Sequence, residues 1–267
     1  MIIDISYAAA GAVTGFVVGV TGVGGGALMT PLLIFLFGVV PSVAVATDLW
    51  FAALTKLPGA ALHWRAGQVD WQVVRRLWKG SLPVASFTVI WIVFIAPISK
   101  LDWLKAAIGV AVLLTALGLI FAPKINALAR ASRLSEPDKF KAAQPMLTVI
   151  AGGVIGLLVT LTSIGAGVLG SLALLYLYPL RMTPHKLVAT DLVHAIPLAL
   201  VAGLGYLIAG MVDWALLLNL LIGSVPGIIL GSLLTQRVPA RGLQWVIALL
   251  LLGVGANAVI TWLKKAA

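Results

Sequence analysis

The 267-residue sequence lacks cysteine altogether and has few charged residues, which make up only 10% of it. The absence of cysteine excludes disulfide bonds and thiolate metal sites. A soluble domain carries about 25% charged residues, so this chain has too little polar surface to face water on all sides. The alternating apolar periods of about ten residues that indicate a β-barrel are also missing.

The chain contains long runs of apolar residues instead. Hydrophobic residues make up 61% of the chain, and its mean hydropathy is +1.13. Several runs reach the roughly 20 residues that a helix needs to cross the hydrocarbon core of a bilayer. We therefore expect an all-α polytopic membrane protein whose surroundings are the lipid bilayer. The apolar N-terminal run follows no basic segment, so it predicts a retained helix rather than a cleaved signal peptide.

The net charge of +10 would suggest a nucleic-acid partner in a soluble protein. In a membrane protein, basic residues in short loops mark the cytoplasmic face. We therefore expect no nucleic-acid partner.

An internal duplication organises the chain. Five blocks of the first half recur in the same order in the second half, always 141 to 143 residues later. The matched pairs are 21–26 with 162–167, 41–49 with 184–192, 66–71 with 209–214, 80–83 with 223–226, and 101–103 with 243–245.

Each copy is predicted to contain five helical pieces, of which the first two are short and flank a glycine motif. The expected pieces are 5–20, 27–38, 42–63, 74–97 and 103–122, then 147–161, 168–180, 185–208, 215–235 and 242–263. The predicted organisation is a first transmembrane repeat at 1–122, a polar cytoplasmic linker at 123–145 and a second repeat at 146–267. This gives about eight to ten transmembrane or re-entrant segments.

An odd number of pieces per copy predicts that the second repeat is inverted in the membrane. With the N-terminus outside, thirteen Lys and Arg residues fall on the inner face and only Lys100, Lys264 and Lys265 on the outer face. This bias predicts a cytoplasmic linker and periplasmic termini. Inverted repeats with broken helices are typical of secondary transporters. The alternative is a duplicated scaffold without transport.

The glycine motifs interrupt the apolar runs: TGVGGG begins at Thr21 and TSIGAG at Thr162. The pieces beside them are short, so we expect two half-helices that meet at depth with a non-helical loop between them. Such a loop offers backbone N–H groups and a positive helix end to an anion. The candidate binding residues are Thr21, Gly24, Gly25, Gly26, Thr162, Ser163, Gly165 and Gly167. The alternative is close packing through small residues, which fits Gly11, Gly15 and Gly19.

Ionisable residues inside apolar helices are costly and mark functional sites. Asp48 and Asp191 occupy the same repeat position, each after a threonine, Thr47 or Thr190. Lys56 and His194 have no counterpart of their own kind, since Ala199 and Phe51 stand at the equivalent positions. We predict that Lys56 or His194 attracts an anion and that an aspartate exchanges protons. The alternative is a polar network that fastens the two copies together.

The remaining polar residues indicate no further chemistry. His63, Asp70 and His185 lie at predicted helix ends, as interfacial residues do. The three histidines do not have metal-ligand spacing, so we expect no metal and no cofactor.

Three segments of the first half and their counterparts in the second half resemble the TauE/SafE family of membrane transporters. They are the glycine block, the Ala-Thr-Asp-Leu segment and the HWRAGQVDW stretch. The resemblance covers roughly residues 8–260. It implies export or exchange of sulfite, sulfoacetate or related organosulfonates across the bacterial inner membrane, with binding at the glycine motifs, Thr47 and Thr190. Many family members have serine where this chain has Asp48 and Asp191, and this departure bears on the substrate.

The sequence allows other interpretations beside a proton-coupled transporter of a small anion. Transport can run as uptake instead of export, or the substrate can be a small carboxylate or another ion. A Ser163–His194 dyad would make an intramembrane enzyme, although we expect no enzyme. An accessory subunit without flux of its own is another alternative. The oligomeric state is open, with a homodimer as one option.

Overall fold

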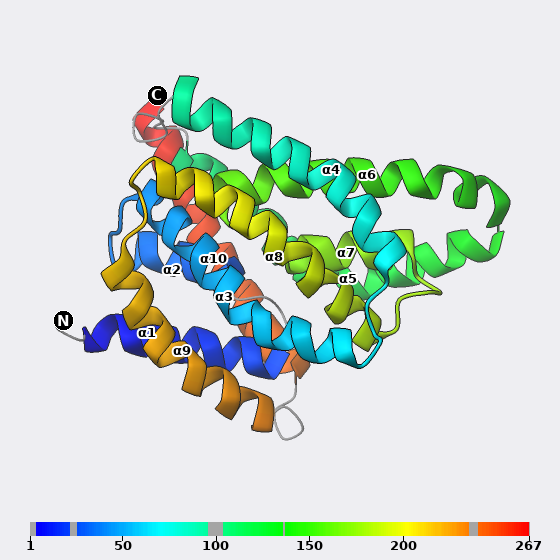
Figure 1. The fold of residues 1–267 in the computed structure, drawn as a ribbon, viewed down its shortest axis with the longest axis horizontal. Coiled ribbons are helices and arrows are strands. Elements are labelled where there is room, and N and C mark those ends of the chain that lie inside the picture. Colours follow the sequence, from blue (N-terminus) through cyan, green and yellow to red (C-terminus); the bar gives the residue numbers. More distant parts are fainter. Residues whose placement is uncertain (1–3, 22–25, 96–103, 136, 235–239, 267) are drawn as a thin grey trace.

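The computed structural model describes residues 4–21, 26–95, 104–135, 137–234 and 240–266, and within these ranges the chain is helical without strands (Figure 1). The first half contains α1 (Ile5–Thr21), α2 (Gly26–Phe35), α3 (Pro41–Arg65), α4 (Trp71–Ile90, continued by the π-turn Trp91–Ile95) and α5 (Leu104–Ser135). The second half contains α6 (Pro137–Thr162), α7 (Val168–Leu177), α8 (Pro184–Ile208), α9 (Trp214–Leu234) and α10 (Ala240–Ala266). All ten predicted pieces are confirmed as helices.

The polar linker predicted at 123–145 is helical over 123–135 and 137–145. The expected helices ended at 122 and began at 147, whereas α5 runs to Ser135 and α6 begins at Pro137. The segment is rich in Ala, Lys, Arg and Leu, which favour helix without needing apolar surroundings. In Figure 1 the C-terminal part of α5 and the N-terminal part of α6, together called the α5–α6 turn, project from the bundle. They lie at the end opposite to the start of α1 and the end of α10.

Six helices are long and apolar enough to cross a membrane, namely α4, α5, α6, α8, α9 and α10. The helix α3 has 25 residues but carries Asp48 and Lys56 in its buried part. The protein is therefore a multi-pass membrane protein, in which the N-terminal half of α3 is buried among the other helices.

Two helix pairs pack backbone to backbone through glycine. In the pair α1–α9, a Cβ at Gly11 or Gly15 would overlap the backbone of Leu220 or Ser224. In the pair α4–α6, a Cβ at Gly156 would lie 2.5 Å from the carbonyl oxygen of Ser81. The small-residue packing predicted for the first helix is thus confirmed.

These two pairs occupy equivalent positions in the duplication, because α6 corresponds to α1 and α4 corresponds to α9. Each pair joins the first helix of one copy to the fourth helix of the other. The copies are therefore interlaced and do not form two separate halves.

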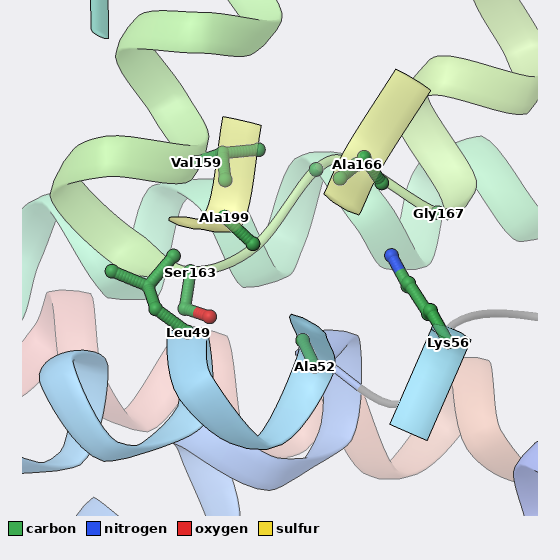
Figure 2. Close-up of a pocket in the computed structure, with 10 residues that line it drawn as sticks. Leu49, Ala52, Lys56, Val159, Ser163, Ala166, Gly167 and Ala199 are labelled. Atoms are coloured by element: carbon green, nitrogen blue, oxygen red, sulfur yellow. The ribbon is translucent and has the colours of Figure 1, made fainter. Parts of the chain in front are cut away.

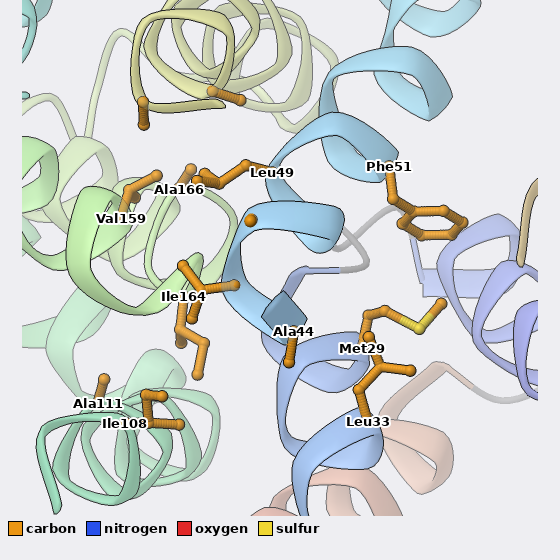
Figure 3. Close-up of a cluster of buried hydrophobic side chains, with 14 of the residues drawn as sticks. Met29, Leu33, Ala44, Leu49, Phe51, Ile108, Ala111, Val159, Ile164 and Ala166 are labelled. Atoms are coloured by element: carbon orange, nitrogen blue, oxygen red, sulfur yellow. The ribbon is translucent and has the colours of Figure 1, made fainter. Parts of the chain in front are cut away.

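The helices α3 and α8 also correspond to each other, and they pack together at the centre of the bundle. Apolar side chains of α3 pack with those of α2, α5 and α6 in a buried cluster around it (Figure 3). Pro41 and Pro184 start the two helices, where a missing N–H costs nothing. Six polar residues of α3 and α8 are buried where the helices meet: Thr47, Asp48, Lys56, Thr190, Asp191 and His194.

Candidate functional site

The second glycine motif forms a five-residue break, 163–167, between α6 and α7. Ser163 has φ of 58° and Gly165 has φ of 125°. Ser163 is the one non-glycine residue with positive φ in the described parts of the chain. A serine in this conformation is uncommon outside sites where the fold imposes it. The predicted break at the glycine motif is therefore present in the second copy, although α6 before it is long enough to cross a membrane and only α7 is a short helix.

In the first copy the corresponding break lies outside the described residues. This applies to Gly24 and Gly25 and to the side chain of Thr21. The described backbone shows that α1 ends at Thr21 and that α2 begins at Gly26, as the half-helix prediction requires.

A small cavity lies where the break faces α3 and α8 (Figure 2). Four predicted site residues line it: Lys56, Ser163, Gly165 and Gly167. The side chain of Lys56 points from α3 toward Ala166 and Gly167 of the break. The cavity has room for about one water molecule, so a larger ligand requires the lining helices to separate.

Asp48 lies beside this cavity and is only partly satisfied. Its Oδ2 accepts a hydrogen bond of 2.6 Å from the hydroxyl of Thr30 on α2. Its Oδ1 is buried without a hydrogen-bond partner, and the Ser163 side chain lies near it. Thr30 was not predicted, although Ser171 stands at the equivalent position of the second copy.

Asp191 is packed against the backbone of α7. A Cβ at Gly170 would lie 2.5 Å from Oδ1 of Asp191, so only glycine leaves room for the carboxylate. Oδ1 of Asp191 is buried and has no hydrogen-bond partner. The role of Gly170 was missed because Met29 occupies the equivalent position and the glycine lies outside the motif.

His194 is fully buried, and its ring contacts α4. Its Nε2 lies 3.0 Å from the hydroxyl of Ser81, and its Nδ1 has no hydrogen-bond partner. His194 and Ser163 therefore do not form the dyad that an intramembrane hydrolase would need. Ser81 lies 113 residues from His194 in the chain, and no local pattern pointed to it.

The unsatisfied atoms gather around one lysine. Among the described residues, five buried side-chain atoms lack a hydrogen-bond partner, and four of them belong to Asp48, Ser163, Asp191 and His194. Lys56 lies within electrostatic range of Asp48, Asp191 and His194. Buried polar atoms are rarely left unpaired in native structures, so this cluster is suited to an exchangeable ligand or proton.

Three of the four threonines predicted at the site have internal partners, and the side chain of the fourth, Thr21, lies outside the described residues. Thr162 donates to the Leu158 carbonyl at 2.6 Å and accepts from the Ile164 N–H at 3.1 Å, which closes the end of α6.

Thr47 and Thr190 make two crossed, equivalent bonds between the copies. The Thr47 hydroxyl accepts from the N–H of Asp213 at 3.3 Å, and that of Thr190 accepts from the N–H of Asp70 at 3.2 Å. Neither threonine lines the cavity of Figure 2. Their geometry fits a role in helix junctions.

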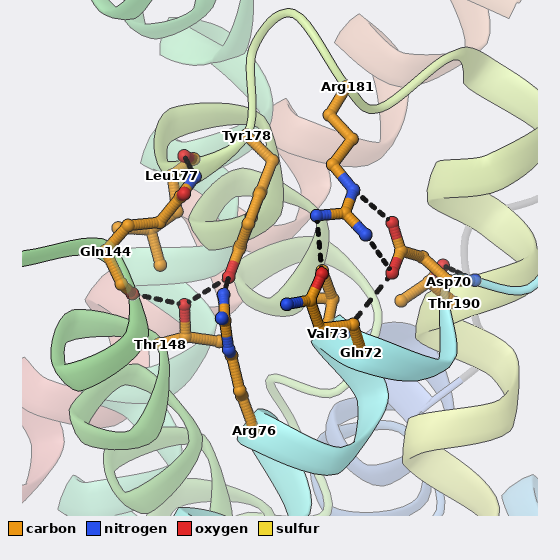
Figure 4. Close-up of polar contacts among 10 residues, drawn as sticks. All are labelled: Asp70, Gln72, Val73, Arg76, Gln144, Thr148, Leu177, Tyr178, Arg181 and Thr190. Atoms are coloured by element: carbon orange, nitrogen blue, oxygen red, sulfur yellow. Dashed lines mark hydrogen bonds and ion pairs between the residues drawn. The ribbon is translucent and has the colours of Figure 1, made fainter. Parts of the chain in front are cut away.

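One end of the bundle carries a polar network between the copies (Figure 4). Arg181 binds both carboxylate oxygens of Asp70, with Nε at 2.5 Å and Nη2 at 2.8 Å, and donates to Gln72 at 2.9 Å. Beside this pair, the Tyr178 hydroxyl accepts from Arg76 at 3.1 Å and lies 2.8 Å from the Thr148 hydroxyl. Asp70, predicted as an interfacial residue, is thus the centre of an interhelical contact.

The site presents the ammonium group of Lys56 and the hydroxyl of Ser163 at the cavity, with two carboxyl groups and an imidazole buried nearby. No group of three or more potential metal ligands occurs among the described residues. These groups at a broken helix are suited to reversible binding of a small ion. The fold and this site define a multi-pass membrane transporter.

Sequence comparison agrees with that class and gives the family. The family model described as "Sulfite exporter TauE/SafE" matches residues 7–258, and the chain belongs to this family.

Relatives of this chain are proteins of Bacillus subtilis (strain 168). The probable membrane transporter protein YjnA is 38% identical over 260 residues, which cover 96% of this chain and all of YjnA. The probable membrane transporter protein YdhB is 29% identical over 230 residues, which cover 84% of this chain and 87% of YdhB. No solved structure shows a significant match.

Proposed function

We propose that the protein is a secondary transporter that carries a small anion, sulfite or an organosulfonate, together with protons across the bacterial inner membrane. The observation that carries this proposal is the cluster of four buried, unpartnered polar atoms around Lys56 at the broken helix. The description of the matching family as sulfite exporters supports the choice of anion.

In this proposal Lys56 binds the anion, since its ammonium group points into the cavity beside the glycine break (Figure 2). Ser163 can donate a hydrogen bond to the same ligand because its side chain lines the cavity, beside Asp48. The N-terminal end of α7, which begins at Val168, adds the partial positive charge of its helix dipole.

Asp48 and Asp191 couple the anion to protons. With both carboxylates ionised, the group formed with Lys56 bears a net negative charge, which repels an anion. Protonation of one aspartate removes that charge and frees Lys56 to pair with the substrate. Anion binding and proton uptake therefore favour each other, so we expect the anion to bind more tightly as the pH falls.

Alternating access follows from two inverted repeats in this proposal, with the α5–α6 turn cytoplasmic and both termini periplasmic. The equivalent pairs α1–α9 and α4–α6 support a duplicated architecture. Because glycine contacts join each pair backbone to backbone, we expect each pair to move as one body. Rocking one whole copy against the other would break both pairs.

The test is flux into proteoliposomes that contain only this protein. Labelled sulfite, 2-hydroxyethanesulfonate, sulfoacetate and taurine are offered with and without a pH gradient. We expect saturable, gradient-driven flux of at least one anion. Lys56→Ala should lower this flux roughly a hundredfold, because it removes the only cation of a buried anion site.

Two further variants complete the experiment. Asp191→Asn should abolish the dependence on the pH gradient, and Asp48→Asn is tested beside it. Lys105→Ala, at an exposed lysine of α5, is the matched control and should transport normally. Full gradient-driven transport by both Asn variants would contradict the coupling role. Folded protein with no flux of any substrate would favour an accessory subunit.

A further inference from the structure

The cavity lies across two equivalent positions of the duplication. Ala52 and Lys56 of α3 correspond to Ala195 and Ala199 of α8, each pair 143 residues apart. All four residues line the same cavity. In Figure 2, Ala199 and Lys56 enter it from opposite walls.

Only one of these walls is charged. The ammonium group of Lys56 stands on the α3 wall, while the equivalent place on the α8 wall holds the methyl group of Ala199, which is 4% exposed. The other ionisable groups near the cavity are Asp48, Asp191 and His194, all within electrostatic range of Lys56. Among the residues that the structure describes, Lys56 is thus the single permanent cation at the cavity.

We propose that Ala199 is a specificity-determining residue, which keeps the second wall neutral and limits the substrate to molecules with one anionic group. This inference rests on the proposed function, in which Lys56 binds the anion. It adds that Lys56 and Ala199 together determine how many anionic groups the substrate can have.

The physical reason is the cost of an unpaired buried charge. A substrate with two anionic groups can pair one of them with Lys56. The other meets a methyl group at Ala199 and lies near the carboxyl groups of Asp48 and Asp191, so it loses water without gaining a counter-ion.

Three two-carbon sulfonates test this on the wild-type protein. 2-Hydroxyethanesulfonate, sulfoacetate and taurine are similar in size and differ in the charge at the end remote from the sulfonate, which is neutral, negative or positive. In isothermal titrations of the purified protein, we expect sulfoacetate to bind at least about tenfold more weakly than 2-hydroxyethanesulfonate. Equal or tighter binding of sulfoacetate overturns the inference and leaves the proposed function standing. Failure of all three and of sulfite to bind contradicts the proposed function itself.

Ala199→Lys should reverse this preference, because it supplies the second cation. We expect sulfoacetate to bind at least about tenfold more tightly to Ala199→Lys than to Ala199→Met. The methionine variant is the matched control, since it has a long unbranched side chain without charge. An unchanged ratio between the two sulfonates in folded Ala199→Lys contradicts the inference.

Moving the cation completes the design. Lys56→Ala should lose binding of 2-hydroxyethanesulfonate, and Lys56→Ala with Ala199→Lys should regain it to within about tenfold of wild type. A double variant that stays as weak as Lys56→Ala contradicts the equivalence of the two walls. Full binding by Lys56→Ala alone contradicts the proposed function instead.

Discussion

The two ends of the bundle are built from equivalent residues but are held closed by different forces. At the end with the α5–α6 turn, an ion pair and hydrogen bonds join the copies through Asp70, Arg181 and Tyr178. At the opposite end, Phe37 stands in place of Tyr178, and its ring packs against Tyr7 with centroids 5.0 Å apart.

The difference extends to other partners of the network. Asp213 corresponds to Asp70, but among the described residues only Asp70 has an arginine partner. Asn219 stands in place of Arg76 and binds the N–H of Asp4 at 3.0 Å. What the two ends share is the crossed pair of threonine bonds from Thr47 and Thr190 and the bond from each aspartate to its own helix, at the Val73 N–H and the Leu216 N–H. The two copies thus share the bonds at their helix junctions but differ in the contacts that hold each end of the bundle together. We therefore expect the two ends to open under different conditions.

The largest effect should follow from breaking the ion pair. The side chain of Asp70 is 7% exposed and that of Arg181 is 44% exposed, so Arg181→Ala leaves a buried carboxylate without its counter-ion. That carboxylate favours a conformation in which it reaches water, and we expect this end to open more readily by about 1–2 kcal/mol.

Cysteine labelling can measure this, because the chain has no cysteine of its own. Ala166→Cys, at the cavity wall, reports access for a membrane-impermeant thiol reagent applied from each side. Labelling from the side of the α5–α6 turn should rise about tenfold in Arg181→Ala. The charge-reversed pair Asp70→Arg with Arg181→Asp should restore slow labelling. Unchanged labelling in Arg181→Ala would show that the ion pair does not hold this end closed.

A comparable effect is expected from making the polar end resemble the apolar one. Tyr178→Phe removes the hydroxyl that contacts Arg76 and Thr148. Loss of two hydrogen bonds should lower the free energy of unfolding by about 1–2 kcal/mol, measured by denaturant unfolding in detergent. Phe37→Tyr at the other end is the matched variant and should not gain this amount. Equal changes at both ends would contradict the comparison.

The shared threonine bonds should behave alike. Thr47→Val and Thr190→Val each remove one hydroxyl acceptor while keeping the shape of the side chain, so each should lower the free energy of unfolding by about 1 kcal/mol. The same unfolding measurement checks the pair. A loss confined to one variant would show that the junctions are not equivalent.

The smallest effect should come from salt. Because Arg181 is partly exposed, added salt screens its attraction to Asp70. Raising the ionic strength should speed labelling of Ala166→Cys from the side of the α5–α6 turn by no more than about threefold. Labelling from the opposite side, where aromatic rings make the contact, serves as the control and should not increase. Equal acceleration on both sides would argue against an ionic closure.

Local properties of the sequence predicted most of the helices and the site. Apolar length gave the ten helical pieces, and glycines in an apolar run indicated the break at 163–167. The repeat then indicated Asp48 and Asp191, which occupy equivalent positions, and Lys56, whose equivalent position holds an alanine. The helical form of 123–135 was missed because a polar helix leaves no hydropathy signal, although its residues favour helix.

Contacts between distant segments could not be predicted in this way. Arg181 meets Asp70 across 111 positions, and Ser81 meets His194 across 113. Such pairs depend on where helices cross, which neither propensity nor periodicity determines. Thr47 and Thr190 show the converse: their repeat positions were predicted, but their partners are backbone N–H groups at helix junctions.

The glycine contacts between α1 and α9 can form only late in biosynthesis. The stripe of Gly11 and Gly15 packs against Leu220 and Ser224, which are translated roughly 200 residues later. At about 5–20 residues per second, α1 stays in the bilayer without its packing partner for roughly 10 to 40 seconds. Each newly made molecule therefore passes through a stage in which a bare glycine face is open to lipid, to a neighbouring chain or to an insertion factor.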